Sequence, residues 1–262
     1  MNNIRKIYIQ RCVETVSAYG FQRKGATFIR AVHDVVQTFT YEKLSSGREC
    51  RVLFSVLPLC LRIEKGYMDG FAYSHELRKF EVQQNNEGGD RWKYDPKSED
   101  SIDSCVEEII RYIKKYLLPF FEKANNSHTA FRELIQVEEQ FDANRKTGLK
   151  LSGIMDRAKP IEERILLDTV IYYLALKNDD YAFALQCRQA LEQQNQNALE
   201  NMLAHGYLDE KEKCSQEKSL SILREECRRL AAGDTAYFKQ ILSENEAYSN
   251  SILHEVLKIR NL

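Results

Sequence analysis

The chain has 262 residues, of which 43% are hydrophobic and 29% charged, with only 11 glycines and 4 prolines. This composition is typical of folded globular proteins and excludes collagen-like and disordered chains. The formal net charge of -1 argues against nucleic acid as the main ligand, because proteins that neutralise phosphate backbones carry a marked cationic excess.

The first part of the chain reads as one helix followed by strands. Residues 4–19 place apolar side chains at helical spacing, and Gly20 and Phe21 are suited to ending that helix and folding back over it. Residues 27–41 and 48–59 are rich in β-branched and aromatic side chains, which predicts antiparallel strands in a simple meander.

The turns and the next elements follow from polar residues. The strands are predicted to turn near His33 and Asp34 and again near residues 45–47, and a short strand is expected over 77–82. A long helix begins at about Asp100, lies on one face of the sheet and is kinked or ended by Pro119.

After residue 126 the pattern predicts only helices, the second of them opened by Pro160. The fold class is therefore α+β, with an antiparallel sheet and two packed helices in residues 1–126 and an all-helical domain in residues 127–262. The predicted helices span residues 128–142, 160–177, 180–204, 210–232, 234–243 and 246–260.

Residues 10–125 resemble the bacterial domain-of-unknown-function family 4304. The matching elements are Gly20-Phe21, Lys24-Gly25, Phe28, Arg30, VVQTF, RWKYDP at 91–96 and YLLPFFEK at 116–123. The resemblance implies a compact α+β domain and brings no reaction or catalytic residues. Members often have a Gln-Lys-Ser-like end to the second strand, whereas this chain has Glu42-Lys43-Leu44. Residues 174–191 resemble one helical hairpin of the tetratricopeptide type.

The chain carries no recognisable motif for a metal, a cofactor or a nucleotide. Its five histidines are isolated, and GxxxxGK[ST], GxGxxG and GxSxG are absent, so we expect no cofactor and no metal. Glu138 and Asp142, four residues apart with Glu139 nearby, could form an acid–base or metal-binding pair on one helix face, although a solvated acidic face is the favoured interpretation. A cysteine–histidine pair formed in space stays open.

Five side chains are candidate ligand-binding residues on the sheet. Strict alternation along residues 27–41 puts Arg30 and Asp34 on one face and His33, Gln37 and Tyr41 on the other. Trp92 could join the second set around a concave surface.

We expect a cytoplasmic protein, because no stretch is long and apolar enough for a membrane helix or a signal peptide. The seven scattered cysteines also fit a reducing compartment. The favoured hypothesis is a non-catalytic module with a protein partner, such as an antitoxin or immunity-type protein. The alternative is an enzyme or small-ligand-binding protein with a pocket between the sheet and the helical domain. Oligomeric state stays open.

Overall fold

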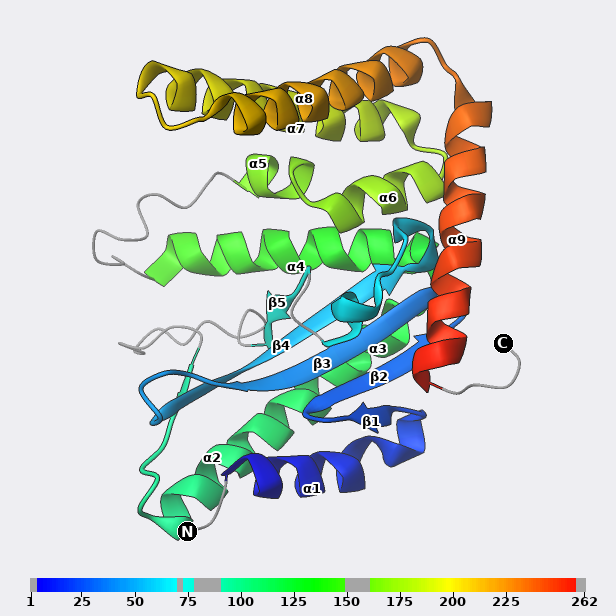
Figure 1. Ribbon diagram of the computed structural model, residues 1–262. Helices are drawn as coiled ribbons and strands as arrows, with labels where there is room; N and C mark the ends of the chain where they lie inside the picture. The colour runs from blue at the N-terminus through cyan, green and yellow to red at the C-terminus, as the bar shows by residue number, and fades with distance from the viewer. Residues whose placement is uncertain (1–3, 70–72, 78–90, 149–160, 258–262) are drawn as a thin grey trace.

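The computed structural model describes residues 4–69, 73–77, 91–148 and 161–257 (Figure 1). Its sheet contains β1 (Gln22–Lys24), β2 (Thr27–Val32), β3 (Val35–Lys43), β4 (Glu49–Pro58), β5 (His75–Glu76) and β6 (Trp92–Lys93). Strands β1 to β5 lie in chain order, β6 also pairs with β4, and all these pairings are antiparallel. The predicted antiparallel meander in an α+β fold is confirmed. Of the strand expected over 77–82, residues 78–82 lie outside the described residues.

Two helical segments cover one face of the sheet. Helix α1 (Ile4–Val16) ends in a 3₁₀ turn closed by Gly20, whose φ of 78° is the left-handed conformation predicted for it. Helix α2 (Glu99–Tyr112) runs through a π-helical turn at Ile113–Leu117 into α3 (Leu118–Lys123). The π turn lies directly before Pro119, which has no N–H for the helical ladder, so the helix continues past the proline and ends at Lys123.

In the described part of the chain, six helices follow residue 126. They are α4 (Ser127–Gly148), α5 (Ile161–Leu166), α6 (Thr169–Lys177), α7 (Tyr181–Ala204), α8 (Glu210–Ala231) and α9 (Thr235–Leu257). The predicted helix over 160–177 is divided because the side chain of Asp168 accepts hydrogen bonds from the backbone N–H groups of Val170 and Ile171, at 2.7 and 3.2 Å, and so starts a new helix. None of the described helices combines the length and apolar character needed to cross a membrane.

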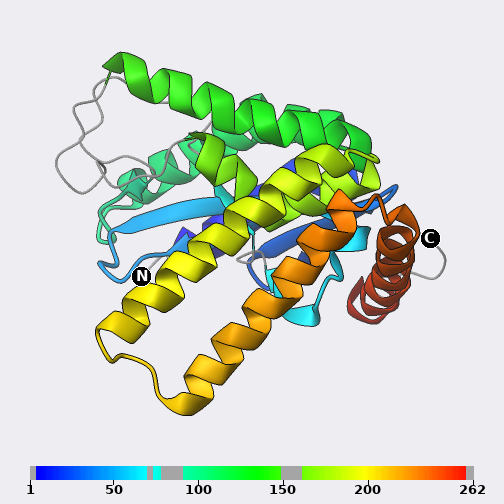
Figure 2. The ribbon, with the colours of Figure 1, turned by 90° about the horizontal axis from the view of Figure 1, so that it is seen from above.

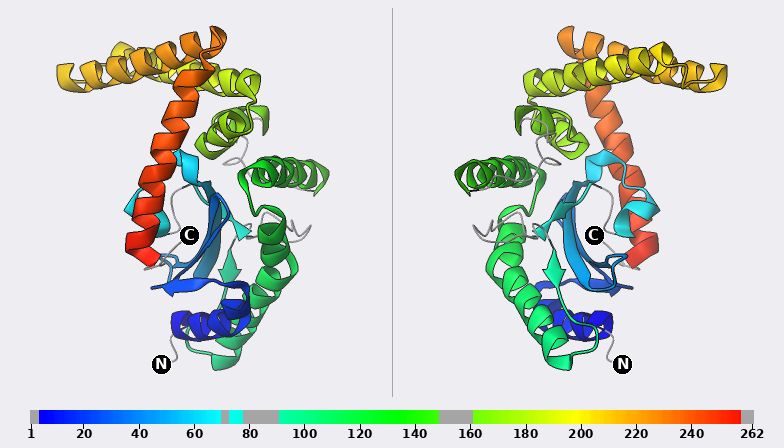
Figure 3. Two further views of the ribbon diagram at one scale, coloured as in Figure 1. Left: turned by 90° about the vertical axis from the view of Figure 1, so that its right-hand side faces the viewer. Right: turned by 90° about the vertical axis from the view of Figure 1, so that its left-hand side faces the viewer.

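The last helix returns to the sheet. Helix α9 was predicted as two helices, but it is continuous through Asn245, whose side chain donates to the carbonyl of Cys60 at 2.9 Å. One turn later, Ser249 accepts from the backbone N–H of Ile63 at 2.7 Å. Figure 3 shows the sheet nearly edge-on, with α9 on one side and α2 and α3 on the other.

One apolar core joins the sheet to the helices that follow it. Leu253 and Leu257 of α9, and Val170 and Leu174 of α6, belong to the same cluster of buried side chains as the strands. A second cluster, which includes Phe238, joins α6, α7, α8 and α9. The predicted boundary near residue 126 falls between α3 and α4, and buried contacts are continuous across it.

Candidate functional site

Arg30 and Gln37 lie on the same face of the sheet. They are directly opposite one another in the β2–β3 register, and paired residues of an antiparallel hairpin project to the same side. The predicted alternation, which put them on opposite faces, is therefore wrong. The predicted alternation treated residues 27–41 as a single strand. His33 instead lies in the turn with a φ of 48° and is exposed. Because the chain reverses there, the inward and outward positions of β2 and of β3 have to be assigned separately.

These two residues form a structural network with the end of α3. Arg30 donates from Nε to Gln37 at 2.8 Å and from a terminal nitrogen to Glu122 at 2.7 Å. The amide of Gln37 donates to the carbonyl oxygens of Phe121 and Ala124 at 2.7 and 3.0 Å. Those carbonyls have no partner within their own helix, so Gln37 caps α3 from the sheet.

Tyr41 and Trp92, two further predicted ligand-binding residues, lie in the core. They are 4% and 1% exposed, the Tyr41 ring lies 4.9 Å from that of Tyr8, and Trp92 packs edge-on against Tyr112 at 5.5 Å. Burial raises the pKa of the Tyr41 hydroxyl. These rings are covered by α1 and α2, and of the five predicted residues only His33 is exposed to solvent.

Glu138 is buried between three elements. One of its carboxylate oxygens lies 3.2 Å from Nδ1 of His75 on β5, and the other lies 3.4 Å from Nε of Arg164 on α5. The favoured interpretation of a solvated acidic face is wrong for this residue, which is 4% exposed, although its neighbour Glu139 is exposed. The Asp142 side chain lies outside the described residues. A carboxylate in this position orients the imidazole.

Glu138 is thus a charged link between β5, α4 and α5. Sequence reasoning placed it on the surface because helical spacing alone does not show which neighbour covers a face. Among the residues that the structure describes, no group of three or more histidine, cysteine, aspartate or glutamate side chains is arranged to hold a metal ion.

The α7–α8 hairpin lies at the opposite end of the molecule from α1, and its tip extends beyond the other helices (Figure 2). Leu199 of α7 and Leu220 and Leu223 of α8 are buried, and the two helices pack along one another. Arg224 of α8 donates to Glu192 of α7 at 3.1 Å. These contacts hold the two helices together over their length.

A buried ion pair fastens the base of this hairpin. Nε of Arg188 on α7 lies 2.7 Å from a carboxylate oxygen of Glu226 on α8, and the guanidinium sits 3.5 Å from the centre of the Tyr172 ring. Burial raises the pKa of Glu226, although Arg188 lowers it. The hairpin therefore has a fixed base as well as an apolar interior.

The outer face of α7 is nearly free of charge. Glu200 is the only charged residue among the exposed positions of this helix, whereas the exposed side of α8 is densely charged. The hairpin tip adds Leu203, 44% exposed, and Tyr207, 73% exposed. The other exposed positions of α7 are Ala182, Gln186, Gln189, Gln193, Gln194, Asn197, Ala198, Asn201 and Ala204.

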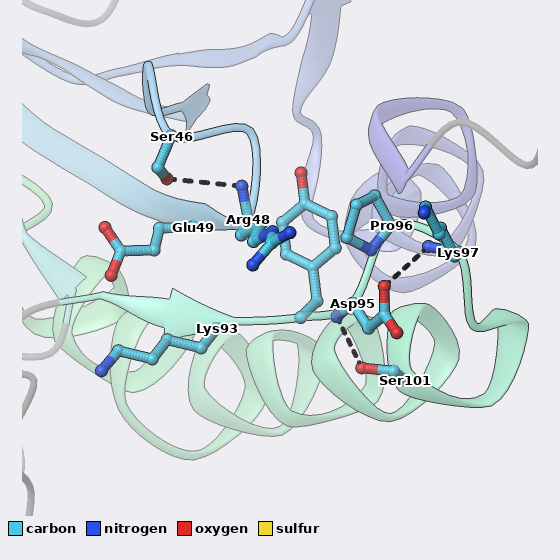
Figure 4. Close-up of a pocket in the computed structure, with 9 residues that line it drawn as sticks. Ser46, Arg48, Glu49, Lys93, Asp95, Pro96, Lys97 and Ser101 are labelled. Carbon is cyan, nitrogen blue, oxygen red and sulfur yellow. Dashed lines mark hydrogen bonds between the residues drawn. The ribbon is translucent and has the colours of Figure 1, made fainter.

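A hollow lies at the other end of the molecule, where the β3–β4 turn, β6 and the start of α2 meet (Figure 4). Its volume is about 870 Å³, and Arg48, Lys93 and Lys97 line it together with Glu49 and Asp95. All the lining residues belong to the first part of the chain, so this hollow is not between the sheet and the helical part. It is a cavity of the size that holds small ligands.

Comparison with protein-family models, with curated proteins and with solved structures finds no match to this chain. The resemblance to family 4304 stays a prediction, as do the cytoplasmic location and the protein partner. Two features of the described residues bear on function: the face of α7, on which Glu200 is the only exposed charge, and the hollow beside β6, in which cations outnumber carboxylates.

Proposed function

We propose that this protein is a non-catalytic interaction module that binds a partner protein through the outer face of α7 and the hairpin tip. The observation that supports the proposal is the scarcity of charge along that face, where Glu200 is the only charged exposed residue. Depletion of charge and exposure of aromatic side chains are what distinguish the centre of a protein interface from ordinary surface.

The composition of the face fits a partner that offers both apolar contact and hydrogen bonds. Amide side chains can donate and accept without the desolvation cost of a charge, and Tyr207 and Leu203 supply apolar area at one end. Tyr207 stacks on His205, with the ring centres 5.4 Å apart and the planes inclined by 14°. A side chain held in this way loses less conformational entropy on binding.

The rigid hairpin supports the same role. Because Arg188, Arg224 and the buried leucines hold α7 against α8, the face is formed before any partner arrives. Preformed surfaces bind with a smaller ordering cost than disordered ones. Antitoxins and immunity-type proteins are one class of molecule that would use such a surface, and we include that class in the proposal.

The test compares charge insertion on the two helices of the hairpin. Gln194→Lys with Leu203→Lys changes the α7 face, and Ser215→Lys with Gln216→Lys adds the same charge to exposed positions of α8. Each protein is used as bait in its source organism, and any stoichiometric partner is then purified and titrated. We expect the α7 variant to lose roughly tenfold or more in affinity and the α8 variant less than roughly twofold.

Hydrogen exchange of the purified complex locates the contact directly. Protection at 186–207 that is lost in the α7 variant would support the proposal. A complex that protects other elements, or one that both variants weaken equally, would contradict it. Since all four substituted positions are exposed, circular dichroism and melting of the free variants should match those of the wild type.

A further inference from the structure

The hollow beside β6 has cations without counterions. Glu49 pairs with Arg91 at 3.3 Å, and the Asp95 carboxylate accepts from the backbone N–H of Lys97 at 2.9 Å. In the part of the chain that the structure describes, the side chains of Arg48, Lys93 and Lys97 have no ion-pair partner. Glu49 is therefore paired and Asp95 accepts a backbone N–H, so the three cations outnumber the two carboxylates of the lining and are available to an anion.

The backbone that carries these cations is well braced. The carbonyl of Arg48 accepts from the backbone N–H of Tyr94 at 2.9 Å, which ties the β3–β4 turn to the segment after β6. The hydroxyl of Ser101 accepts from the backbone N–H of Asp95 at 2.9 Å, and Ser98 caps the start of α2. The side chains therefore project from a preformed frame rather than from independent loops.

The residues that line the hollow indicate which chemical groups a bound anion would carry. Tyr94 and Pro96 provide apolar surface, and the hydroxyls of Ser46 and Ser101 provide polar groups. Figure 4 shows Arg48 between Lys93 and Lys97, so the positive charge is spread along the hollow. A volume of about 870 Å³ exceeds that of a bare phosphate and suits a ligand with an organic part.

We propose that this hollow binds a small phosphorylated organic molecule, with Arg48 as the central phosphate ligand and the two lysines at its sides. A guanidinium can donate two parallel hydrogen bonds to phosphate oxygens, whereas each ammonium adds charge from a flexible stem. This inference is independent of the proposed role of α7, since the two features lie at opposite ends of the molecule.

The test uses the full chain, and phosphate and pyrophosphate as probes, titrated at constant ionic strength with sodium chloride as the reference. We expect pyrophosphate to shift the backbone amide resonances of residues 46–49 and 93–101 in a saturable way and more strongly than phosphate. Arg48→Gln with Lys93→Gln should weaken pyrophosphate binding by roughly tenfold. The matched control is Arg132→Gln with Lys218→Gln, which removes equal charge from exposed positions elsewhere and should change it less than roughly twofold.

Three outcomes would overturn the inference: shifts that follow ionic strength alone, equal weakening in both double variants, or tighter binding of a glutamate-rich peptide than of pyrophosphate. Because Arg48 and Lys93 are exposed, their replacement should leave melting unchanged, and loss of binding can be separated from loss of fold. If pyrophosphate binds as expected, adenosine and sugar phosphates then distinguish which organic part the apolar wall prefers.

Discussion

Arg30 orients the amide of Gln37. Its Nε donates to Oε1 of Gln37 at 2.8 Å, which leaves the amide nitrogen pointing at the end of α3, where it donates to two backbone carbonyls. Gln37 is fully buried. Because a buried carbonyl without a partner costs free energy, the side chain that sequence alternation offered as a ligand contact instead stabilises the packing of α3 on the sheet.

Replacing Gln37 by methionine should lower the free energy of unfolding by about 2–3 kcal/mol, because the Phe121 and Ala124 carbonyls lose their donor while the volume is kept. Gln37→Glu should also destabilise, since a carboxylate can accept from Arg30 but cannot donate to carbonyls. Urea denaturation measures both. Gln194→Met, on the exposed face of α7, is the control and should stay within about 0.5 kcal/mol; equal effects at the two positions would contradict the capping role.

Asp34 should contribute to stability by capping α4 from the β2–β3 turn. Its carboxylate accepts from the backbone N–H of Ser127 at 2.9 Å and also from the Ser127 hydroxyl, at the positive end of the helix dipole. Asp34→Ala should cost about 1–2 kcal/mol in thermal or urea denaturation. Asp103→Ala, at an exposed position of α2, should cost less than about 0.5 kcal/mol, and a similar loss in both variants would argue against the cap.

The features that were predicted correctly are those whose cause is local. Gly20 closes the turn after α1 because glycine adopts a left-handed φ there, which follows from the neighbouring residues. Phe21 was expected to fold back over that helix, but its ring packs on Phe39 of β3. Gln37 and Glu138 were misplaced because their partners are remote. The carbonyl that Gln37 caps lies 84 positions along the chain, and periodicity shows which residues share a face but not what covers it.

The sequence indicates the low charge of α7 but not its exposure, and it does not indicate the hollow. The stretch QQNQNALENMLAHG contains one charged residue, Glu200, so the sequence shows a helix poor in charge, but whether that face is exposed depends on where α5 and α6 lie. Arg48 and Lys93 come from segments that meet only because β6 pairs with β4. No spacing between them in the sequence indicates a shared cavity.

The Arg188–Glu226 pair should give stability a distinct pH dependence. Burial holds the pKa of Glu226 above its ordinary value of 4.5, so the native state binds a proton that the unfolded chain releases. The contribution of this group is therefore fully present below the unfolded pKa and is lost as pH rises through the raised one. Glu226→Gln, neutral at every pH, should gain stability relative to the wild type as pH rises above the ordinary pKa of 4.5, and the difference should level off once pH exceeds the raised pKa.

Glu225→Gln is the matched control for that measurement. The pKa of Glu225 is lowered to about 2 by its hydrogen bond from Arg228, so its titration ends below the window and the difference from wild type should stay flat between about pH 5 and about pH 8. Urea midpoints across the pH range provide the data. If Glu226→Gln instead loses stability relative to the wild type as pH rises, the ion pair outweighs the cost of burial and the pKa of Glu226 is lowered rather than raised.

The thiols should differ sharply in reactivity, because only a thiolate reacts with Ellman's reagent. Cys214 on α8 is exposed, whereas Cys227 is half-buried and the other five are buried. Burial raises the pKa of Cys12 to about 12 and that of Cys227 to about 11. In the native protein at about pH 8 we expect one thiol to react quickly, and Cys214→Ser should remove that fast phase.

Unfolding in urea without a reductant should then expose all seven thiols. Cys50 and Cys105 provide the check on this count, since their sulfur atoms lie 4.0 Å apart, well beyond a disulfide bond length of about 2 Å. Five reactive thiols in urea that rise to seven after reduction would mean that one pair of cysteines closes in the purified protein. If that pair is Cys50 and Cys105, Cys50→Ser should show the same number of reactive thiols in urea with and without a reductant, because the variant removes one sulfur of the pair.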